Sequence, residues 1–369
     1  MSLVQQVLKD LEERRQKVEN GGVNCIPSPF PAFTRDFPGV EQSKYYLVSG
    51  SAKSAKTQLT SLLFLYTPLL YAYYHPEQVS VHIIYFPLEE TKEKITERFM
   101  CHLLYEMSGH KIRVSPMELR SVTDNKAIDK GILDILNTLE YQSILSFYEE
   151  HVQFEKDKNP TGCMKKVLAY AEQNGTFLKK WDERLKKEVF ASYKPNNPNE
   201  YVIVIWDHAG LTSLEKSEGR LLNLKECIDK LSSYFVDFRD NLHYTPVLVQ
   251  QQNMDTISLD AFKLKKIMPT LAGLADTKNS GKDCTLMIGI TNPHAFELDD
   301  YRGYNTKRLG SYGRFVEVVL NREGESNGYL PLYFDGATNF FRPLPRFDDA
   351  AKLKEVYNLI DRNMGLVPK

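Results

Sequence analysis

One stretch of the sequence decides the fold: Gly50-Ser51-Ala52-Lys53-Ser54-Ala55-Lys56-Thr57. It matches the phosphate-binding P-loop, G-x-x-x-x-G-K-[ST], except that Ala55 replaces the last glycine. In a P-loop, a turn between a strand and a helix aims backbone N–H groups and the positive helix end at phosphate oxygens. Lys56 would then reach the β- and γ-phosphates, and Thr57 would hold Mg²⁺. The stretch therefore predicts a site for a nucleoside triphosphate with Mg²⁺.

The residues on either side supply the strand and the helix that a P-loop needs. Residues 44–49 form a short apolar run, and residues 58–74 form a long apolar stretch typical of a buried helix. Ala55 weakens the match, because a positive φ at this position would cost alanine roughly 1 kcal/mol or more. An ordinary Gly/Ser turn with a solvated lysine is the alternative that these residues leave open.

Composition and charge are those of an ordinary globular protein. Among 369 residues, 47 lysines and arginines nearly balance 48 aspartates and glutamates, so any binding of nucleic acid must come from local loops. The N-terminus lacks a signal pattern, and the apolar residues 59–74 are short for a membrane span and contain Pro68. The five cysteines form no C-x-x-C pair, which argues against zinc and disulfides. We expect a cytoplasmic protein with no membrane partner.

Short apolar strands alternate with helical stretches along most of the chain. This alternation predicts an α/β fold with a mainly parallel sheet, whose last two strands form an antiparallel edge. Between residues 91 and 194 we expect mostly helix, with the lysine-rich part from 149 to 187 as a solvated helical face. The expected strands cover residues 45–48, 79–86, 201–206, 246–250, 284–290, 315–320 and 329–334.

The chain begins with a predicted amphipathic helix. Apolar residues recur at helical spacing between residues 2 and 19, and the following Asn-Gly-Gly at 20–22 is a helix stop. The sequence leaves open whether this helix packs on its own domain or on a neighbouring subunit. We divide the chain into a linker helix (1–22), a core domain (23–345) and a C-terminal helix or tail (346–369).

Two acidic residues follow strands at the sheet edge where the P-loop is expected. Asp207 comes directly after the strand 201–206, as in a Walker B motif, and would bind the hydration shell of Mg²⁺ opposite Thr57. Glu89 follows the strand 79–86, where a carboxylate can polarise an attacking water. The alternative for Glu89 is an acid in the first turn of a helix, stabilised by the helix dipole together with Glu90 and Glu93.

At these residues the sequence resembles the RecA-like ATPase domain of DnaB-type replicative helicases. Residues 86–90, Phe-Pro-Leu-Glu-Glu, followed by Arg98, are similar to that family's catalytic-glutamate motif. The similarity continues in chain order through residues 23–48, 246–253, 269–283 and 321–334. Within it, Gln251 is the best match for the glutamine that senses the γ-phosphate, with Gln250 one register away, and Arg322 matches the arginine finger.

The resemblance implies a hexameric, ATP-driven helicase that translocates on single-stranded DNA, with a primase or a loader as further partner. ATP would lie between subunits, with Glu89 as catalytic base and Gln251 as sensor in one subunit and Arg322 supplied by the next. A plain surface arginine beside acidic neighbours is the alternative for Arg322. DNA would contact loops after Asp207 and Gln251, unless their basic residues belong to a solvated helix face: Lys216, Arg220, Lys263, Lys265 and Lys266.

Several departures from the family pattern keep other functions open. Ala55 replaces the P-loop glycine, Leu320 replaces the hairpin lysine, and Pro87 interrupts the glutamate motif. The sequence also has no room for the family's N-terminal helical domain, which docks primase and loaders. We therefore expect a divergent homologue from a phage or mobile element, in the host cytoplasm if phage-encoded. The alternatives are a RecA-fold assembly protein with a degenerate ATP site, and a loader or recombinase-like ATPase.

Overall fold

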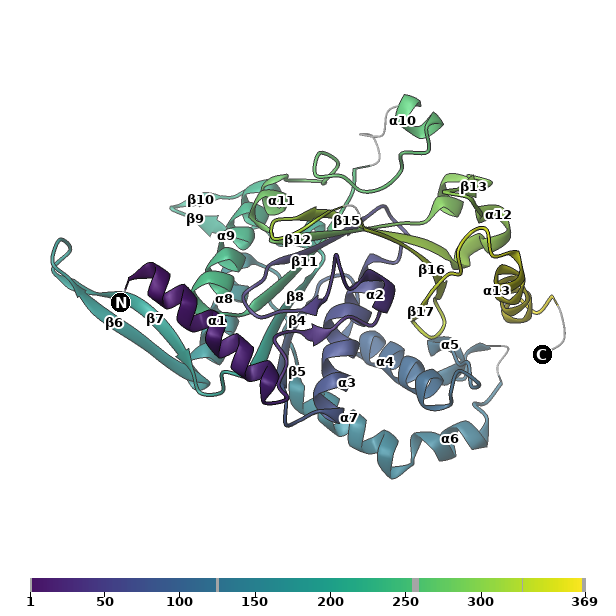
Figure 1. The fold of residues 1–369 in the computed structure, drawn as a ribbon, viewed down its shortest axis with the longest axis horizontal. Helices are drawn as coiled ribbons and strands as arrows, with labels where there is room; N and C mark the ends of the chain where they lie inside the picture. Colours follow the sequence, from purple (N-terminus) through teal and green to yellow (C-terminus); the bar gives the residue numbers. More distant parts are fainter. Residues whose placement is uncertain (1, 124–125, 254–258, 327, 367–369) are drawn as a thin grey trace.

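The computed structural model describes residues 2–123, 126–253, 259–326 and 328–366, without the side chains of residues 259 and 261. A nine-stranded sheet crosses the molecule in the order β17-β16-β15-β12-β3-β11-β8-β4-β5 (Figure 1). All neighbours from β12 to β5 pair in parallel, and β15 to β17 add an antiparallel edge. The strands are β3 (Tyr46–Gly50), β4 (Ser80–Pro87), β5 (Val152–Phe154), β8 (Glu200–Asp207), β11 (Thr245–Gln251), β12 (Leu286–Thr291), β15 (Gly313–Asn321), β16 (Tyr329–Asp335) and β17 (Phe340–Pro343).

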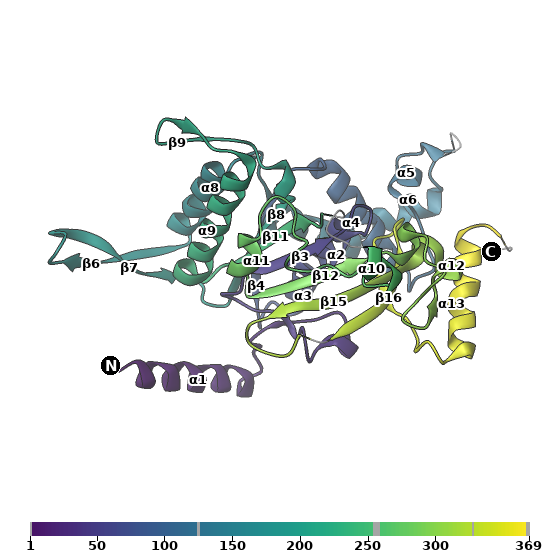
Figure 2. The same ribbon diagram turned by 90° about the horizontal axis from the view of Figure 1, so that it is seen from above.

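The predicted sheet is thus confirmed, and helices bury both of its faces (Figures 1 and 2). Side chains alternate along β4, where Val81 and Ile83 enter one apolar core and Ile84 and Phe86 enter the other. The first core also receives α2 (Lys56–Ser61), α3 (Thr67–Tyr74), α4 (Lys92–Met107) and α7 (Leu139–His151). The second receives α8 (Pro160–Gln173) and α9 (Leu224–Leu242). Two-sided burial explains why these strands are apolar throughout and not alternating in sequence.

The helix predicted after the P-loop forms, with a local irregularity. Between α2 and α3 lies a π-helical turn, η2 (Leu62–Tyr66), so the helical path runs from Lys56 to Tyr74. Pro68 at the start of α3 has no N–H to donate to the preceding turn, and its ring would clash with the carbonyl four residues earlier. A π-bulge is a standard way for a helix to accommodate such a residue.

The expectation of mostly helix between residues 91 and 194 is wrong in two places. β5 joins the sheet edge, and residues 175–195 form an antiparallel hairpin of β6 (Gly175–Asp182) and β7 (Lys187–Pro195) in place of a solvated helical face. The hairpin sequence alternates lysines with aromatic and β-branched residues, which favour strands, and the lysines obscured this period. The stretch is otherwise helical, with α4, α5 (Pro116–Leu119), α6 (Lys130–Leu136), α7 and α8.

Smaller elements complete the chain at its ends and loops. The predicted N-terminal helix, α1 (Leu3–Glu19), has no buried residue, whereas α13 (Ala350–Asn363) buries Leu353, Val356 and Ile360. No helix among the described residues is long and apolar enough to cross a membrane. The remaining elements are β1 (Ile26–Pro27), β2 (Gly39–Val40), β9 (Lys216–Ser217), β10 (Arg220–Leu221), α10 (Leu259–Lys263), α11 (Asn279–Asp283), β13 (Asp300–Tyr301), β14 (Tyr304–Asn305) and α12 (Thr306–Leu309).

Candidate nucleotide-binding site

The P-loop connects the end of β3 to the start of α2, at the edge formed by the carboxyl ends of the parallel strands. Gly50 is required here, because a Cβ on it would lie 2.4 Å from the carbonyl oxygen of Ile290. The loop closes on the carbonyl of Ser51, which accepts from Ser54 Oγ at 2.8 Å and from Lys56 Nζ at 2.9 Å. The backbone N–H groups at the start of α2 therefore lie beside the lysine, as phosphate binding requires.

Ala55 adopts the backbone conformation for which the consensus glycine is used. Its φ is +76° and its ψ is +35°, in the left-handed region, directly before the first residue of α2. For an alanine this conformation costs about 1–2 kcal/mol. The methyl group is only 8% exposed and belongs to the first apolar core. Burial of that methyl contributes about 0.8 kcal/mol, which offsets much of the strain.

Thr57 and Asp207 meet at the centre of the site. Thr57 Oγ1 donates to Asp207 Oδ1 at 3.2 Å, and Tyr85 donates from its hydroxyl to Asp207 Oδ2 at 3.0 Å. Burial raises the pKa of Asp207 from 3.8 to about 6, while the two hydrogen bonds oppose that shift. A hydroxyl and a carboxylate side by side are oxygen ligands of the kind Mg²⁺ uses. Ser51 Oγ, in the P-loop, is buried without a hydrogen-bond partner, which fits a loop shaped for an additional polar group.

Glu89 lies in front of helix α4 and not in its first turn. The helix begins at Lys92 with Thr91 as N-cap, and only Glu93 is an acid of the first turn, so the helix-dipole alternative for Glu89 is wrong. Glu90 pairs with Arg98, which leaves Glu89 as the exposed carboxylate of the motif. Burial lowers the pKa of Lys56, and the charges of Glu89 and Asp207 partly offset this, so both carboxylates lie near enough to act on the lysine.

The three glutamines at the end of β11 have different surroundings. Gln250 is buried, donates to the carbonyls of Ala275 and Thr277, and accepts from Ser280 Oγ. Gln252 donates to Ser49 Oγ at 2.8 Å. Gln251 pairs in register with Gly50, and its side chain has no hydrogen-bond partner among the described residues. The structure therefore leaves Gln251, and not Gln250, able to reach a phosphate bound at the P-loop.

Arg322 lies at the opposite edge of the sheet. β12 runs parallel to β3, and β15 returns antiparallel to β12, so that Asn321 pairs with Leu286 at the start of β12. This places Arg322 roughly 13 Å of strand away from the level of Gly50. Its guanidinium donates to the carbonyl of Cys284 at 2.8 Å and to that of Lys282. Arg322 cannot serve the P-loop of its own chain, so a role at a nucleotide requires a second subunit.

Arg314 is a residue of the site that sequence reasoning missed. It lies at the P-loop end of β15, is almost fully buried, and donates through Nε to the carbonyl of Ser54 at 2.9 Å. Its other hydrogen bonds go to the carbonyls of Ser311 and Gly313, and no carboxylate pairs with it within the described part of the chain. Burial lowers the pKa of the guanidinium to about 10. The result is a buried cation that fixes the P-loop backbone and adds positive potential behind it.

The basic residues predicted to contact DNA lie on two loops at the P-loop edge. Lys216 and Arg220 belong to the small hairpin of β9 and β10, so the alternative of a solvated helix face is wrong for them. Arg220 is paired bidentately with Glu226 at 2.7 and 3.0 Å, and Lys265 is paired with Asp300. Among the described residues, the remaining three have no ionic partner: Lys216, Lys263 and Lys266.

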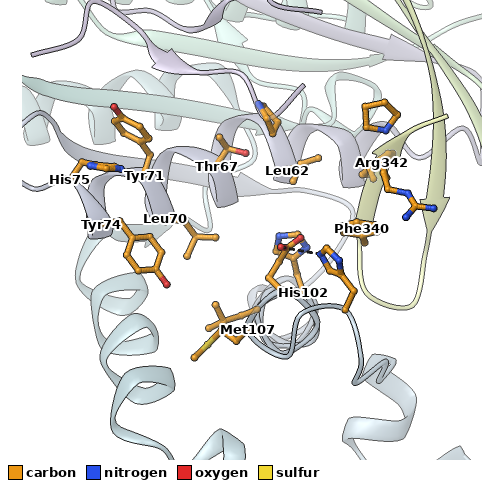
Figure 3. A pocket seen from close by; sticks show the side chains of 16 residues that line it. Leu62, Thr67, Leu70, Tyr71, Tyr74, His75, His102, Met107, Phe340 and Arg342 are labelled. Carbon is orange, nitrogen blue, oxygen red and sulfur yellow. Dashed lines mark hydrogen bonds and ion pairs between the residues drawn. The ribbon is translucent and has the colours of Figure 1, made fainter. Parts of the chain in front are cut away.

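A separate cavity of about 690 Å³ opens between α3, α4 and β17 (Figure 3). Its walls are mostly apolar and aromatic, with Leu70, Tyr74, Met107 and Phe340 turned toward it. His102 and other polar groups lie at its margins, but none of residues 50–57 lines it. The chemistry of phosphate binding is therefore at the sheet edge and not in this cavity.

The energetics of Ala55 give a first prediction. Ala55→Gly removes about 1–2 kcal/mol of strain but also loses methyl burial and loosens the unfolded chain by about 0.4–1 kcal/mol. We expect the free energy of unfolding in urea to change by less than about 1 kcal/mol. Ala55→Val, with a branched side chain at positive φ in a packed site, should lose at least about 2 kcal/mol. A large stabilisation by glycine would contradict the proposed compensation.

The pKa of Asp207 gives a second prediction. Its folded pKa of about 6 lies above the unfolded value of 3.8, so the folded protein binds the extra proton and loses stability as pH rises from about 4 to about 6. Without divalent cations, Asp207→Asn should escape this loss. Its stability advantage over wild type should grow by about 3 kcal/mol between pH 4 and pH 7. Urea unfolding at each pH measures this, with Asp134→Asn on the surface of α6 as control.

Comparisons with known proteins agree with the fold. No protein-family model and no curated protein matches the sequence. Among solved structures, an ATPase domain determined on its own superposes with a TM-score of 0.62 at 13% identity, covering 93% of this chain and 99% of that one. A DnaB-like replicative helicase, described with its interactions with primase, gives a TM-score of 0.60 at 12% identity over 92% of this chain and 66% of that one. The chain therefore has the RecA-like P-loop ATPase fold found in DnaB-type replicative helicases.

Proposed function

We propose that the protein is an ATP-dependent motor of the replicative-helicase type, which assembles into a ring, expected to be hexameric, and translocates on single-stranded DNA. The observation that supports this most directly is the division of the ATPase residues between two edges of one sheet. Lys56, Thr57, Asp207, Glu89 and Gln251 converge at one edge, whereas Arg322 lies at the other. A head-to-tail contact between subunits would complete each site, and such contacts generate rings or filaments.

Each residue has a defined task in hydrolysis at this site. Lys56 and the N–H groups at the start of α2 hold the phosphates, and Arg314 fixes the backbone of the loop that presents them. Mg²⁺, held by Thr57 with Asp207 behind it, neutralises phosphate charge when bound. Glu89 accepts a proton from the attacking water, and Gln251 contacts the γ-phosphate. Because this chemistry depends on positioning and charge, no covalent intermediate on the protein is needed.

The neighbouring subunit supplies the remaining positive charge through Arg322. An arginine contributed in trans raises phosphoryl-transfer rates by about a thousandfold or more. In the isolated chain, the Arg322 guanidinium is bound to carbonyls of its own subunit. We infer that assembly releases it, so that hydrolysis depends on contact with a neighbour. The exposed apolar side of α1, which includes Leu3, Val7 and Leu11, is suited to dock on a neighbour in the same assembly.

Two observations favour a second candidate, a RecA-fold assembly protein with a degenerate ATP site. The left-handed Ala55 and the absence of a lysine at Leu320 both depart from an efficient ATPase. Such a protein would form the same head-to-tail contacts and bind nucleotide weakly. A loader or recombinase-like ATPase, which would form open polymers on DNA, is distinguished from a ring by electron microscopy.

The motor predicts that two inactive variants restore each other. Lys56→Ala disables the site of its own subunit, and Arg322→Ala disables the site of the neighbour, so each alone should lose at least about a hundredfold of its DNA-stimulated ATP hydrolysis. In an equimolar mixture, about a quarter of the sites combine an intact P-loop with an intact arginine from the next subunit. We therefore expect the mixture to recover a measurable part of wild-type activity.

The control pairs two variants that damage the same edge. Lys56→Ala mixed with Glu89→Gln should stay inactive, because no site then receives both intact residues. Recovery in this control, or full activity of Arg322→Ala alone, would contradict the shared site. Wild-type protein that binds no nucleotide and still forms oligomers would instead support the assembly protein.

The DNA contacts give a separate prediction. Replacing Lys263, Lys265 and Lys266 with alanine should weaken binding of single-stranded DNA and reduce its dependence on salt. Each lysine that contacts a phosphate contributes about 0.7 to the slope of log affinity against log salt. Since Lys265 is paired with Asp300, we expect the slope to fall by about 1.4, mainly from the other two. Lys354→Ala on α13 is the control, and an unchanged slope in the triple variant would refute this placement.

A further inference from the structure

The hairpin of β6 and β7 is a long arm that the proposed motor does not use. It projects from the body of the molecule in both views (Figures 1 and 2). β7 ends at Pro195, shortly before β8 begins at Glu200, so the arm leaves from the sheet edge opposite the P-loop. Most side chains of both strands are exposed. The arm is therefore available to a partner at a place remote from the nucleotide.

The base of the arm is firmly attached to the body. Tyr193 is buried, and its hydroxyl donates to the carbonyl of Ala171 in α8 at 3.1 Å. The rings of Phe177 and Tyr193 lie 5.2 Å apart, and a Cβ on Gly175 would collide with the Tyr193 ring. A two-stranded hairpin alone is marginally stable in water, so this anchor is what holds the outer half in place.

The arm is the most clearly basic segment of a nearly neutral chain. Residues 175–195 contain six basic and three acidic side chains, a net charge of +3, while the whole chain has −1. Lys179 lies 3.8 Å from Glu188. The other five basic side chains have no ionic partner within the described residues: Lys180, Arg184, Lys186, Lys187 and Lys194. Unpaired cations on an exposed ribbon fit a polyanion, and a phosphate backbone is one that needs only flexible positive side chains.

An exposed tryptophan sits among these cations. Trp181 is 57% exposed near the outer end of β6, where it pairs across the ribbon with Glu188. Because side chains alternate along a strand, Lys179 and Trp181 share one face, and Lys180 points to the other. An exposed indole flanked by cations is the combination that binds single strands, in which unpaired bases stack and phosphates are neutralised. The bases of a duplex are already stacked and would leave the indole without a partner.

We propose that the β6–β7 arm is a second binding site for single-stranded nucleic acid, in which Trp181 stacks on a base while Lys180 and Lys187 neutralise phosphates. The site is separate from the loops at the P-loop edge and does not depend on ATP hydrolysis. In an assembled motor it would hold a strand outside the path defined by those loops.

The chain offers a direct optical test, because it has only two tryptophans. Trp206 is fully buried in β8, so a change in emission on DNA binding comes from Trp181. Full-length protein carrying the Lys263, Lys265 and Lys266 alanine substitutions is titrated with oligothymidine in the absence of nucleotide. We expect saturable quenching, and none in the same protein with Trp181→Phe, whose Trp206 emission also reports that the core is folded.

Affinity measured by fluorescence anisotropy of labelled oligothymidine completes the test. Trp181→Ala should weaken binding about fivefold or more, and Lys180→Glu with Lys187→Glu at least tenfold, while Lys354→Glu leaves it unchanged. Unquenched emission would overturn the proposal, as would equal quenching by a duplex of the same length. An acidic protein partner would give that negative result with DNA. A protein that quenches but never hydrolyses ATP would support the arm while refuting the motor.

Discussion

The parallel register of β3, β11, β8 and β4 is the constraint on which the site depends. Gly50 pairs with Gln251, Val249 pairs with Asp207, and Asp207 pairs with Pro87. The P-loop, the sensor glutamine, the buried aspartate and the Glu89 loop therefore leave the sheet at one level, although about half the chain separates them in sequence. A shift of one residue in any pair would turn each side chain of that strand to the other face. Two-sided burial of apolar side chains is what fixes the register.

The sequence was sufficient for the sheet because its strands are short, apolar and separated by helices. It was also sufficient for Asp207 and Glu89, because a polar residue after such a strand must emerge at the carboxyl edge. It could not separate Gln250 from Gln251, since adjacent glutamines give the same signal until a register assigns one to the interior. Arg314 gave no signal at all. A basic residue at the end of a strand looks solvent-exposed, and only the tertiary packing shows that it is buried behind Ser54.

The error between residues 149 and 194 has a different origin. Charge was taken as the sign of a solvated helix, whereas the chain forms α8 and then the basic arm. Lysines are tolerated on an exposed ribbon as easily as on a helix, so their number says nothing about the period. The informative residues were Phe177, Trp181, Val189 and Phe190, which favour strands. Their spacing on either side of a polar turn is a hairpin signal.

The energetics of the site bear on whether the motor is intact. Ala55, the most visible departure from the P-loop consensus, costs little, because its strain is largely offset by burial of its methyl group. Asp207 is the expensive residue, since burial without a cation costs about 3 kcal/mol at neutral pH. An assembly protein would be more stable with asparagine there, which keeps an oxygen for Thr57 and Tyr85. A carboxylate held at such a cost is explained by a cation beside Thr57, which favours a working nucleotide site over a purely structural one.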